Sequence, residues 1–274
     1  MKRNGMTIVL LLAAGFLTAG SCTVKEDRQP CPCYLDLDYR ELLAADLFAG
    51  VPGTVDVAIF LPELSARCTH ALESCPASEE QTVSRDTARV VALISNRIPE
   101  GFPSGGTTVR YEAGNQMDSL YVHTCLVNCA GEEAVCVLKP HKQFSTLTLT
   151  DEKEGSILRQ YNLVVRGTTC GLDAADLSAL EGPYLYTVQE YDRNGRISVR
   201  IPRQTESSLM LEFYDKETYQ HLFTSPLGLY LFDAGYDPSA EDLEDYAFTI
   251  NFERALIYLR IGDWEKEYIY ETYR

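Results

Sequence analysis

Hydrophobic and polar residues alternate along much of this chain, as they do in strands that bury one face. In the run Tyr34-Leu-Asp-Leu-Asp-Tyr39, Leu35 and Leu37 fall on one face, and Asp36 and Asp38 fall on the other. This period of two predicts a half-buried strand. The same alternation, or a run of β-branched and aromatic residues, predicts further strands at 54–61, 88–94, 119–125, 144–150, 159–165, 184–190, 196–201, 209–214, 227–232, 246–252, 255–261 and 264–273.

Few segments favour any other structure. Residues 237–243, with Pro238 near their start, predict one helical turn. Residues 65–85 are polar and rich in Cys and Ser, which predicts an irregular excursion. Asn194-Gly195 predicts a tight hairpin, because both residues tolerate positive φ. Short strands at regular spacing with few helices predict an all-β protein made of β-sandwiches.

A charged segment that contains a glycine, residues 151–156, lies between two strand patterns. Such a segment is typical of a domain border. We therefore expect an N-terminal β-sandwich domain over residues 33–151 and a C-terminal β-sandwich domain over residues 157–274.

The first 21 residues have the layout of a signal peptide. Lys2 and Arg3 precede an apolar run from Met6 to Leu17, and small residues follow it. The run is shorter than the roughly 20 apolar residues of a membrane-spanning helix. Leu17-Thr-Ala-Gly-Ser-Cys22 resembles the bacterial lipobox, which implies cleavage before Cys22 and attachment of diacylglycerol and an acyl chain such as palmitate. Residues 22–32 would then be a lipidated polar tether; an ordinary signal peptide with an incidental cysteine is the alternative.

Charge narrows the range of partners. The chain has 24 Lys and Arg against 40 Asp and Glu, and removal of residues 1–21, with their two basic residues, changes the net charge from −16 to −18. Nucleic acids and anionic lipid surfaces are polyanions, so such a charge argues against both as partners.

Eight cysteines follow Cys22, and in a secreted protein we expect them to form disulfides. Seven precede residue 140, so either Cys170 bonds back to the first half or at least two thiols stay free. A local bridge between Cys68 and Cys75 is compatible with their short spacing. A zinc site is a weaker alternative for four of them, because their spacing matches no known finger. The eight candidates are Cys31, Cys33, Cys68, Cys75, Cys125, Cys129, Cys136 and Cys170, and the zinc alternative concerns Cys31, Cys33, Cys125 and Cys129.

Motifs for catalysis and cofactor binding are not found in the sequence. No pair among His70, His123, His141 and His221 has metal-ligand spacing, and there is no HExxH, GxSxG, P-loop or dinucleotide fingerprint. The abundant carboxylates leave a glycosidase-like pair open, but none stands out. We expect no enzyme activity, no metal and no cofactor.

Several features follow one another along the chain: Cys22, Lys25-Glu-Asp27, Cys31-Pro-Cys33, the alternating run 34–39, Gly167-Thr-Thr-Cys-Gly-Leu-Asp173 leading to Gly182, and Ile261-Gly-Asp-Trp264. In this order they resemble the FimB-like fimbrial anchor family of Bacteroidales surface lipoproteins. The resemblance implies two tandem transthyretin-like β-sandwich domains after a lipidated tether, a place on the surface of the outer membrane, and other fimbrial subunits as partners.

In related polymerising subunits a C-terminal strand fills a groove in a neighbour, and such strand addition gives affinity through main-chain hydrogen bonds. By that analogy, the segment carrying Trp264, Tyr268 and Tyr270 is a candidate donor strand; the alternative is that it is the last strand of its own sandwich. For the whole protein, a glycan- or host-ligand-binding adhesin is the alternative function, and a secreted hydrolase is a third.

Overall fold

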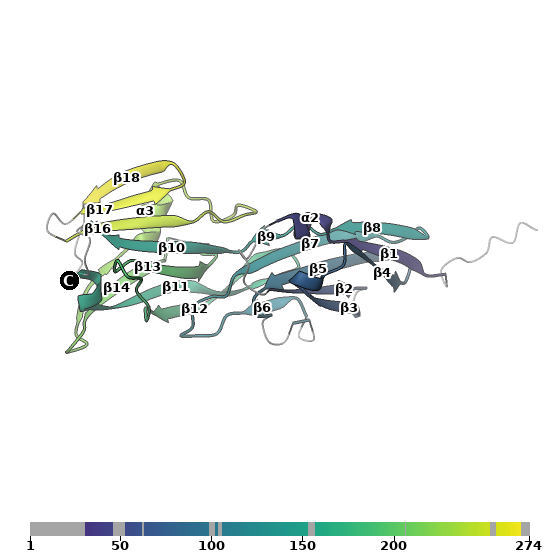
Figure 1. The fold of residues 1–274 in the computed structure, drawn as a ribbon, viewed down its shortest axis with the longest axis horizontal. Helices are drawn as coiled ribbons and strands as arrows, with labels where there is room; N and C mark the ends of the chain where they lie inside the picture. Colours follow the sequence, from purple (N-terminus) through teal and green to yellow (C-terminus); the bar gives the residue numbers. More distant parts are fainter. Residues whose placement is uncertain are drawn as a thin grey trace, which may run out of the picture.

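The computed structural model describes residues 31–45, 53–61, 63–98, 102–103, 106–152, 157–205, 207–252 and 256–269. The molecule is elongated, with an N-terminal and a C-terminal half placed end to end (Figure 1). Strands dominate both halves, so the all-β sandwich expectation is confirmed. Within these ranges, none of the helices has the length and hydropathy to cross a membrane. The helical segments are α2 (Arg40–Ala44), α3 (Leu227–Asp233) and the 3₁₀ turns η1 (Leu72–Ser74) and η2 (Ile157–Gln160).

Two sheets form the N-terminal half, and we call them sheet A and sheet B. In sheet A the central strand β1 runs antiparallel to β4 and parallel to β8. Leu35 and Leu37 are fully buried against sheet B, as their alternation predicts. Sheet A has the order β4 (Ser78–Val83), β1 (Cys33–Asp38), β8 (Glu133–Val137), and sheet B has the order β3 (Leu64–Ala71), β2 (Thr54–Phe60), β5 (Thr87–Ser95), β7 (Leu120–Asn128), β9 (His141–Lys142).

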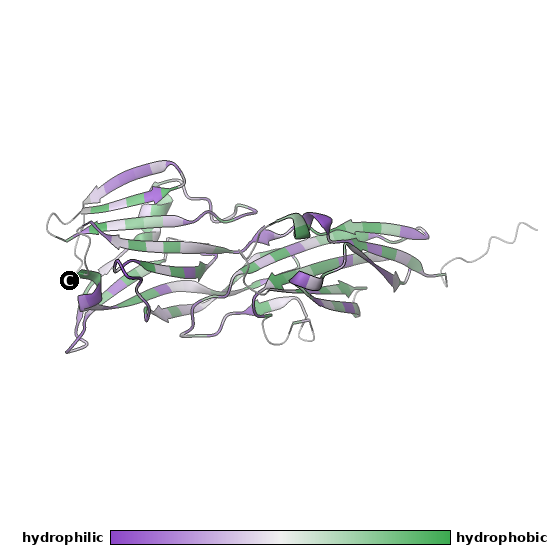
Figure 2. Cartoon of the chain, viewed as in Figure 1, coloured by the Kyte–Doolittle hydropathy of each residue, from purple (hydrophilic) through white to green (hydrophobic). Residues whose placement is uncertain are grey.

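Sheet B is buried on both faces. Along β5, Val90 and Ile94 pack in the core shared with sheet A, whereas Val91 and Leu93 pack in a second cluster on the other face. The sequences of its central strands are therefore almost continuously hydrophobic, without the alternation of a half-buried strand. Figure 2 shows these runs along β5 and β7.

Two further sheets, C and D, enclose the core of the C-terminal half. Phe213 of sheet C and Phe248 of sheet D are both fully buried in this core. Sheet C has the order β12 (Ser178–Thr187), β11 (Tyr161–Asp173), β14 (Met210–Asp215), β15 (His221–Ser225), with β6 (Thr108–Arg110) also on β11, and sheet D has the order β13 (Ile197–Pro202), β10 (Phe144–Asp151), β16 (Tyr246–Asn251), β17 (Leu256–Ile261), β18 (Trp264–Ile269).

The long strand β11 joins the two halves. Leu163 and Val165 near its start pack in the C-terminal core, but Leu172 near its end packs on the outer face of sheet B. There it meets Val109 of β6, and β6 pairs with this end of β11. One strand therefore supplies apolar side chains to both halves.

The pairing of β10 bears on where the chain divides. The expected border was at residues 151–156, which leaves β10 in the N-terminal domain. Its hydrogen-bonded neighbours are β13 and β16, both of the C-terminal half. We propose that the two sandwiches divide at Gln143, just before β10.

The expectation of an irregular excursion at residues 65–85 was wrong. This stretch contains β3, η1 and β4. Ala66, Cys68 and His70 alternate toward the interior along β3, with more exposed residues between them. Their period of two was obscured because these side chains are small or polar.

Two turn predictions also need correction. Asp192–Gly195 does form a turn, in which Gly195 has φ +78° and the Asp192 carboxylate accepts bonds from the backbone N–H groups of Asn194 and Arg196. The turn leads from β12 of sheet C to β13 of sheet D, so it is not a hairpin. Residues 237–243 form turns and bends instead of the predicted helical turn. Strand β8 was not predicted from the sequence.

We expect the substitution Leu172→Ala to destabilise the whole protein. Leu172 is 1% exposed, and its truncation leaves a cavity between β11 and sheet B. Such cavities lower the free energy of unfolding by about 2–4 kcal/mol. Chemical denaturation measures this, and Leu126→Ala, at a side chain that is 62% exposed, is the matched control with a change below about 0.5 kcal/mol. Equal effects of the two substitutions would contradict a packed junction.

Candidate functional site

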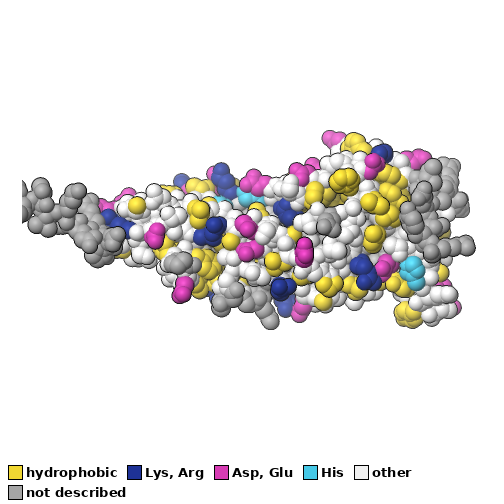
Figure 3. All heavy atoms as spheres, turned by 180° about the vertical axis from the view of Figure 1, so that it is seen from behind, with side chains coloured by type: hydrophobic (Ala, Val, Ile, Leu, Met, Phe, Trp, Pro, Cys, Tyr) yellow, Lys and Arg dark blue, Asp and Glu magenta, His cyan; other side chains and the backbone are white. Residues whose placement is uncertain are grey.

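A short helix in the C-terminal half presents hydrophobic side chains to solvent. Residues 227–232 were predicted as a strand, but they form α3, so that prediction was wrong. A short apolar run does not distinguish strand from helix by itself. Leu227 and Leu231, four positions apart, are buried on the core, whereas Leu229 and Phe232 are 48% and 76% exposed. Figure 3 shows hydrophobic side chains gathered over this end of the molecule.

Close packing holds α3 in place. The backbone N–H of Gly228 donates to the carbonyl of Leu209 at 2.8 Å. A Cβ on Gly228 would lie 2.4 Å from backbone atoms of Ser207, so only glycine fits there. The helix is therefore fixed against the segment that enters β14, and its outer face is presented at a defined position.

Beside α3 lies a pocket of about 710 Å³. It is bounded by α3, by the end of β13 and by the residues that follow α3, and most of its wall is apolar. Its lining residues are Ser145, Pro202, Gln204, Thr205, Ser207, Leu209, Gly228, Leu229, Leu231, Phe232, Gly235, Tyr236, Asp237, Pro238 and Tyr246.

The candidate donor segment forms β18 in this structure. It pairs antiparallel with β17 at the edge of sheet D, so it is the last strand of its own sheet. The Tyr268 hydroxyl donates to the carbonyl of Tyr230 at 3.1 Å, whereas Trp264 is 39% exposed. Tyr270 lies outside the described residues, as does Cys22.

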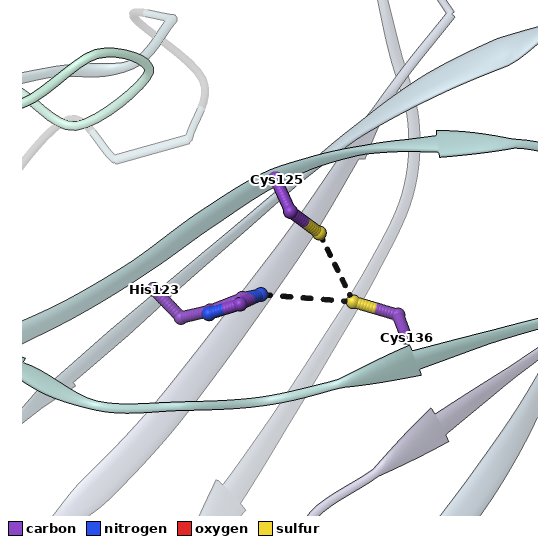
Figure 4. Close-up of side chains that lie close together, drawn as sticks. All are labelled: His123, Cys125 and Cys136. Carbon is purple, nitrogen blue, oxygen red and sulfur yellow. Dashed lines mark hydrogen bonds between the residues drawn. The ribbon is translucent and has the colours of Figure 1, made fainter.

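Two sulfurs and an imidazole meet inside the N-terminal sandwich (Figure 4). Cys136 Sγ of β8 lies 3.3 Å from Cys125 Sγ and 3.8 Å from His123 Nε2, both of β7. His123 Nδ1 lies 3.2 Å from both the backbone N and O of Lys139. The contact with Cys136, aided by His123, lowers the pKa of the Cys125 thiol, while Cys125 and burial raise that of Cys136.

A second cluster lies at the opposite side of the same sandwich. His70 Nε2 and Glu79 Oε2 are 2.6 Å apart, and Cys68 lies beside both. Tyr39, which is fully buried, has its hydroxyl 3.5 Å from Cys68 Sγ. Burial raises the pKa of the Cys68 and Cys75 thiols to about 11.

Both clusters have the composition of a metal site. The ligand atoms of His123, Cys125 and Cys136 lie within 4.8 Å of one another, and so do those of Cys68, His70 and Glu79. Thiolate and imidazole suit zinc, which takes four ligands. Neither trio was recognised from the sequence, because each joins a Cys and a His on one strand to a residue of another sheet, 9 residues from His70 in one case and 11 from Cys125 in the other. Of the four cysteines in the zinc alternative, only Cys125 belongs to a trio.

The remaining cysteines divide into a buried pair and two others. Cys33 and Cys129 are fully buried beside each other, and burial, followed by the neighbouring Cys33, raises the pKa of Cys129 to about 11. Cys31 is exposed, and the Cys170 thiol donates to the carbonyl of Glu181 at 3.4 Å. All eight candidates are free thiols in this structure, so their expected oxidation stays a prediction.

The other two histidines have ordinary surface partners. His141 contacts Asp242 at 3.2 Å and Glu241 at 3.4 Å. His221 Nε2 lies 2.9 Å from the hydroxyl of Thr224. Neither histidine lines the pocket beside α3.

No family model matches the sequence, and no curated protein matches it. Several solved structures do match along almost their whole length. A proposed polysaccharide-binding protein of Bacteroides thetaiotaomicron has a TM-score of 0.62 at 12% identity, with 86% of this chain and 98% of that chain covered. A proposed adhesin of Bacteroides ovatus has a TM-score of 0.57 at 14% identity, with 87% and 95% covered.

The fimbrial anchor protein Mfa2 of Porphyromonas gingivalis is a third match. Its TM-score is 0.54 at 12% identity, with 89% of this chain and 100% of that chain covered. At such identities the likeness concerns the fold alone. The resemblance seen in the sequence is confirmed at that level: the chain has the fold that Mfa2 and these Bacteroides proteins share.

Proposed function

We propose that this chain is a non-catalytic, surface-exposed lipoprotein subunit of a fimbria, held in the outer membrane through lipid on Cys22. Its place would be that of an anchor or accessory subunit, and it would join neighbouring subunits by β-strand addition. The fold shared with Mfa2 supports the fimbrial part of this proposal. The lipobox resemblance supports the lipid attachment.

The elongated shape is the observation that carries the proposal. β1 begins eleven residues after Cys22 and lies in the half away from α3 and β18 (Figure 1). Eleven residues reach at most about 40 Å when extended. A lipid on Cys22 would therefore keep the N-terminal sandwich close to the membrane and direct the C-terminal sandwich outward, where a partner can reach it.

The outward half has the features that strand addition requires. β13 and β18 are the two edges of sheet D, and edge strands leave backbone N–H and C=O groups to pair with another chain. The apolar pocket beside α3 adjoins the end of β13 at Pro202. A neighbouring subunit would gain main-chain hydrogen bonds from an edge and apolar contact from Leu229 and Phe232.

A carbohydrate-binding adhesin is the second candidate. Phe232 and Tyr219 are 76% and 73% exposed, and aromatic rings of this kind are available for stacking against sugars. Two of the matching structures are described as an adhesin and as polysaccharide-binding. Co-purification with filament subunits separates the two candidates.

Intact-mass spectrometry of the native protein tests the anchor proposal. Filaments are sheared from cells, and both the filament fraction and the remaining outer membrane are measured. We expect a chain that begins at acylated Cys22 and that carries bound filament subunits. The matched variant Cys22→Ser lacks the thiol that accepts diacylglycerol, so it should lose the lipid and leave the outer membrane.

Each other outcome has a distinct meaning. An acylated chain that is always free of filament subunits would end the fimbrial role and favour a glycan array as the next experiment. An unacylated chain in the membrane fraction would refute the lipoprotein assignment and leave the question of the filament open to the same co-purification.

We expect Phe232→Asp to reduce co-purification with filament subunits at least several-fold, because it places a charge at the centre of the apolar surface. The side chain is 76% exposed, so the free energy of unfolding should change by less than about 0.5 kcal/mol. Leu126→Asp, at an exposed position in the other half, is the control and should leave co-purification unchanged. Equal loss with both variants would argue against α3 as the contact surface.

A further inference from the structure

Six of the eight cysteines lie in three neighbouring pairs. Cys125 and Cys136 have their sulfurs 3.3 Å apart. Cys33 and Cys129 are both fully buried in the core cluster between the two N-terminal sheets, and Cys68 and Cys75 both pack against that same cluster. Cys31 is exposed, and the Cys170 thiol contacts the carbonyl of Glu181.

Each pair connects sheet A, or the chain that leads into it, with sheet B. Cys33 is the first residue of β1 in sheet A, and Cys129 directly follows β7 in sheet B. Cys136 lies in β8 of sheet A and Cys125 in β7. In the third pair, Cys68 lies in β3 of sheet B and Cys75 lies on the connection from β3 to β4 of sheet A.

Sheet A needs such connections. It has three strands, and in the described part of the chain its ladder hydrogen bonds run within the sheet, so apart from the chain connections it is held to sheet B by side-chain packing. Strand β1 is the centre of this small sheet and directly follows the tether.

We propose that three disulfides form and that Cys31 and Cys170 stay reduced: Cys33–Cys129 and Cys125–Cys136 cross-link sheet A to sheet B, and Cys68–Cys75 joins β3 to the segment that leads into β4. For Cys125 and Cys136, the sulfurs must approach from 3.3 Å to the bond length of about 2.05 Å, which side-chain rotation can provide. This assignment answers the question that the sequence left open: Cys170 does not bond back to the first half.

The oxidation requires an acceptor for two electrons per bridge, and a disulfide-bonded oxidoreductase of the cell envelope supplies it. The Cys125 thiolate attacks one sulfur of the acceptor, which releases the acceptor's other sulfur as a thiol and gives a mixed disulfide. Cys136 then loses its proton and displaces the acceptor. The protein gains one disulfide, and the acceptor leaves as a dithiol.

One bridge has a mechanical consequence, which rests on the proposed anchoring at Cys22. Tension between the membrane and the C-terminal half enters the fold at β1. With Cys33 bonded to Cys129, that tension passes directly from the tether into the chain after β7. Strand β1 then bears no load, and tension cannot extend the chain between Cys33 and Cys129.

Peptide mapping tests the three bridges. The native protein is unfolded in N-ethylmaleimide without reductant, digested and analysed by mass spectrometry. We expect the three cross-linked peptide pairs and N-ethylmaleimide on Cys31 and Cys170. Alkylation of all eight cysteines, or a different pairing, would overturn the proposal, as would one equivalent of zinc found by elemental analysis with Cys125 and Cys136 alkylated.

Stability measurements provide a second test. Cys129→Ser should lower the melting temperature by roughly 10 °C without reductant, because the bridge closes a loop of nearly 100 residues in the unfolded chain. With reductant present, the variant and the parent protein should melt within about 2 °C of each other. Cys170→Ser is the control and should cause no shift under either condition. A shift that persists unchanged in reductant would indicate lost packing and overturn the bridge.

Single-molecule stretching between residue 31 and the C-terminal half tests the mechanical role. On full unfolding, addition of reductant should lengthen the parent protein by roughly 340 Å, the extended length of the chain between Cys33 and Cys129. Cys33→Ser should show most of that length without reductant, because the two remaining bridges close only short loops, and an unchanged length would refute the bridge. Because no membrane or filament takes part, this measurement tests the bridge independently of the proposed anchoring.

Discussion

Val91 and Leu93 of β5 face away from sheet A and are still completely buried, because a cluster that includes Leu172 from the other half of the chain covers them. Burying such a face is worth roughly 25 cal/mol for each Å² of apolar surface removed from water. The N-terminal sandwich therefore does not bury all of its apolar surface by itself. Leu172 and Ala174 complete the cover, and this requirement explains why β11 extends beyond the C-terminal sandwich.

The opposite face of sheet B depends on a different kind of contact. Its two flanking strands, β3 and β7, each carry a Cys and a His two positions apart on the inner face. The Cys and His of β3 face Glu79 of β4, and those of β7 face Cys136 of β8; β4 and β8 are the edge strands of sheet A. The margins of this sandwich are thus polar and rich in sulfur, while its centre is aliphatic. Hydrophobic packing determines how the sheets stack, and the margins determine how firmly the smaller sheet is retained.

The sequence predicted what depends on local alternation. The period of two located β1, β2, β10 and most of the C-terminal strands, and their number and spacing indicated the sandwich class. It failed where the outcome depends on distant residues. A run such as Leu227–Phe232 fits a strand or a helix equally well until the core positions of Leu227 and Leu231 are known. The partners of β10 and the contact of Cys33 with Cys129 likewise depend on distant parts of the chain, and the pocket beside α3 is formed by segments that start at Ser145 and end at Tyr246.

The span of β11 also sets the order in which the molecule can be completed. Leu172 and Ala174, which close the outer face of sheet B, come after almost two thirds of the chain. A chain synthesised from its N-terminus therefore leaves part of the apolar face that carries Val91 and Leu93 uncovered until residue 174 is available. During that interval the incomplete chain exposes this apolar surface to solvent and to other proteins.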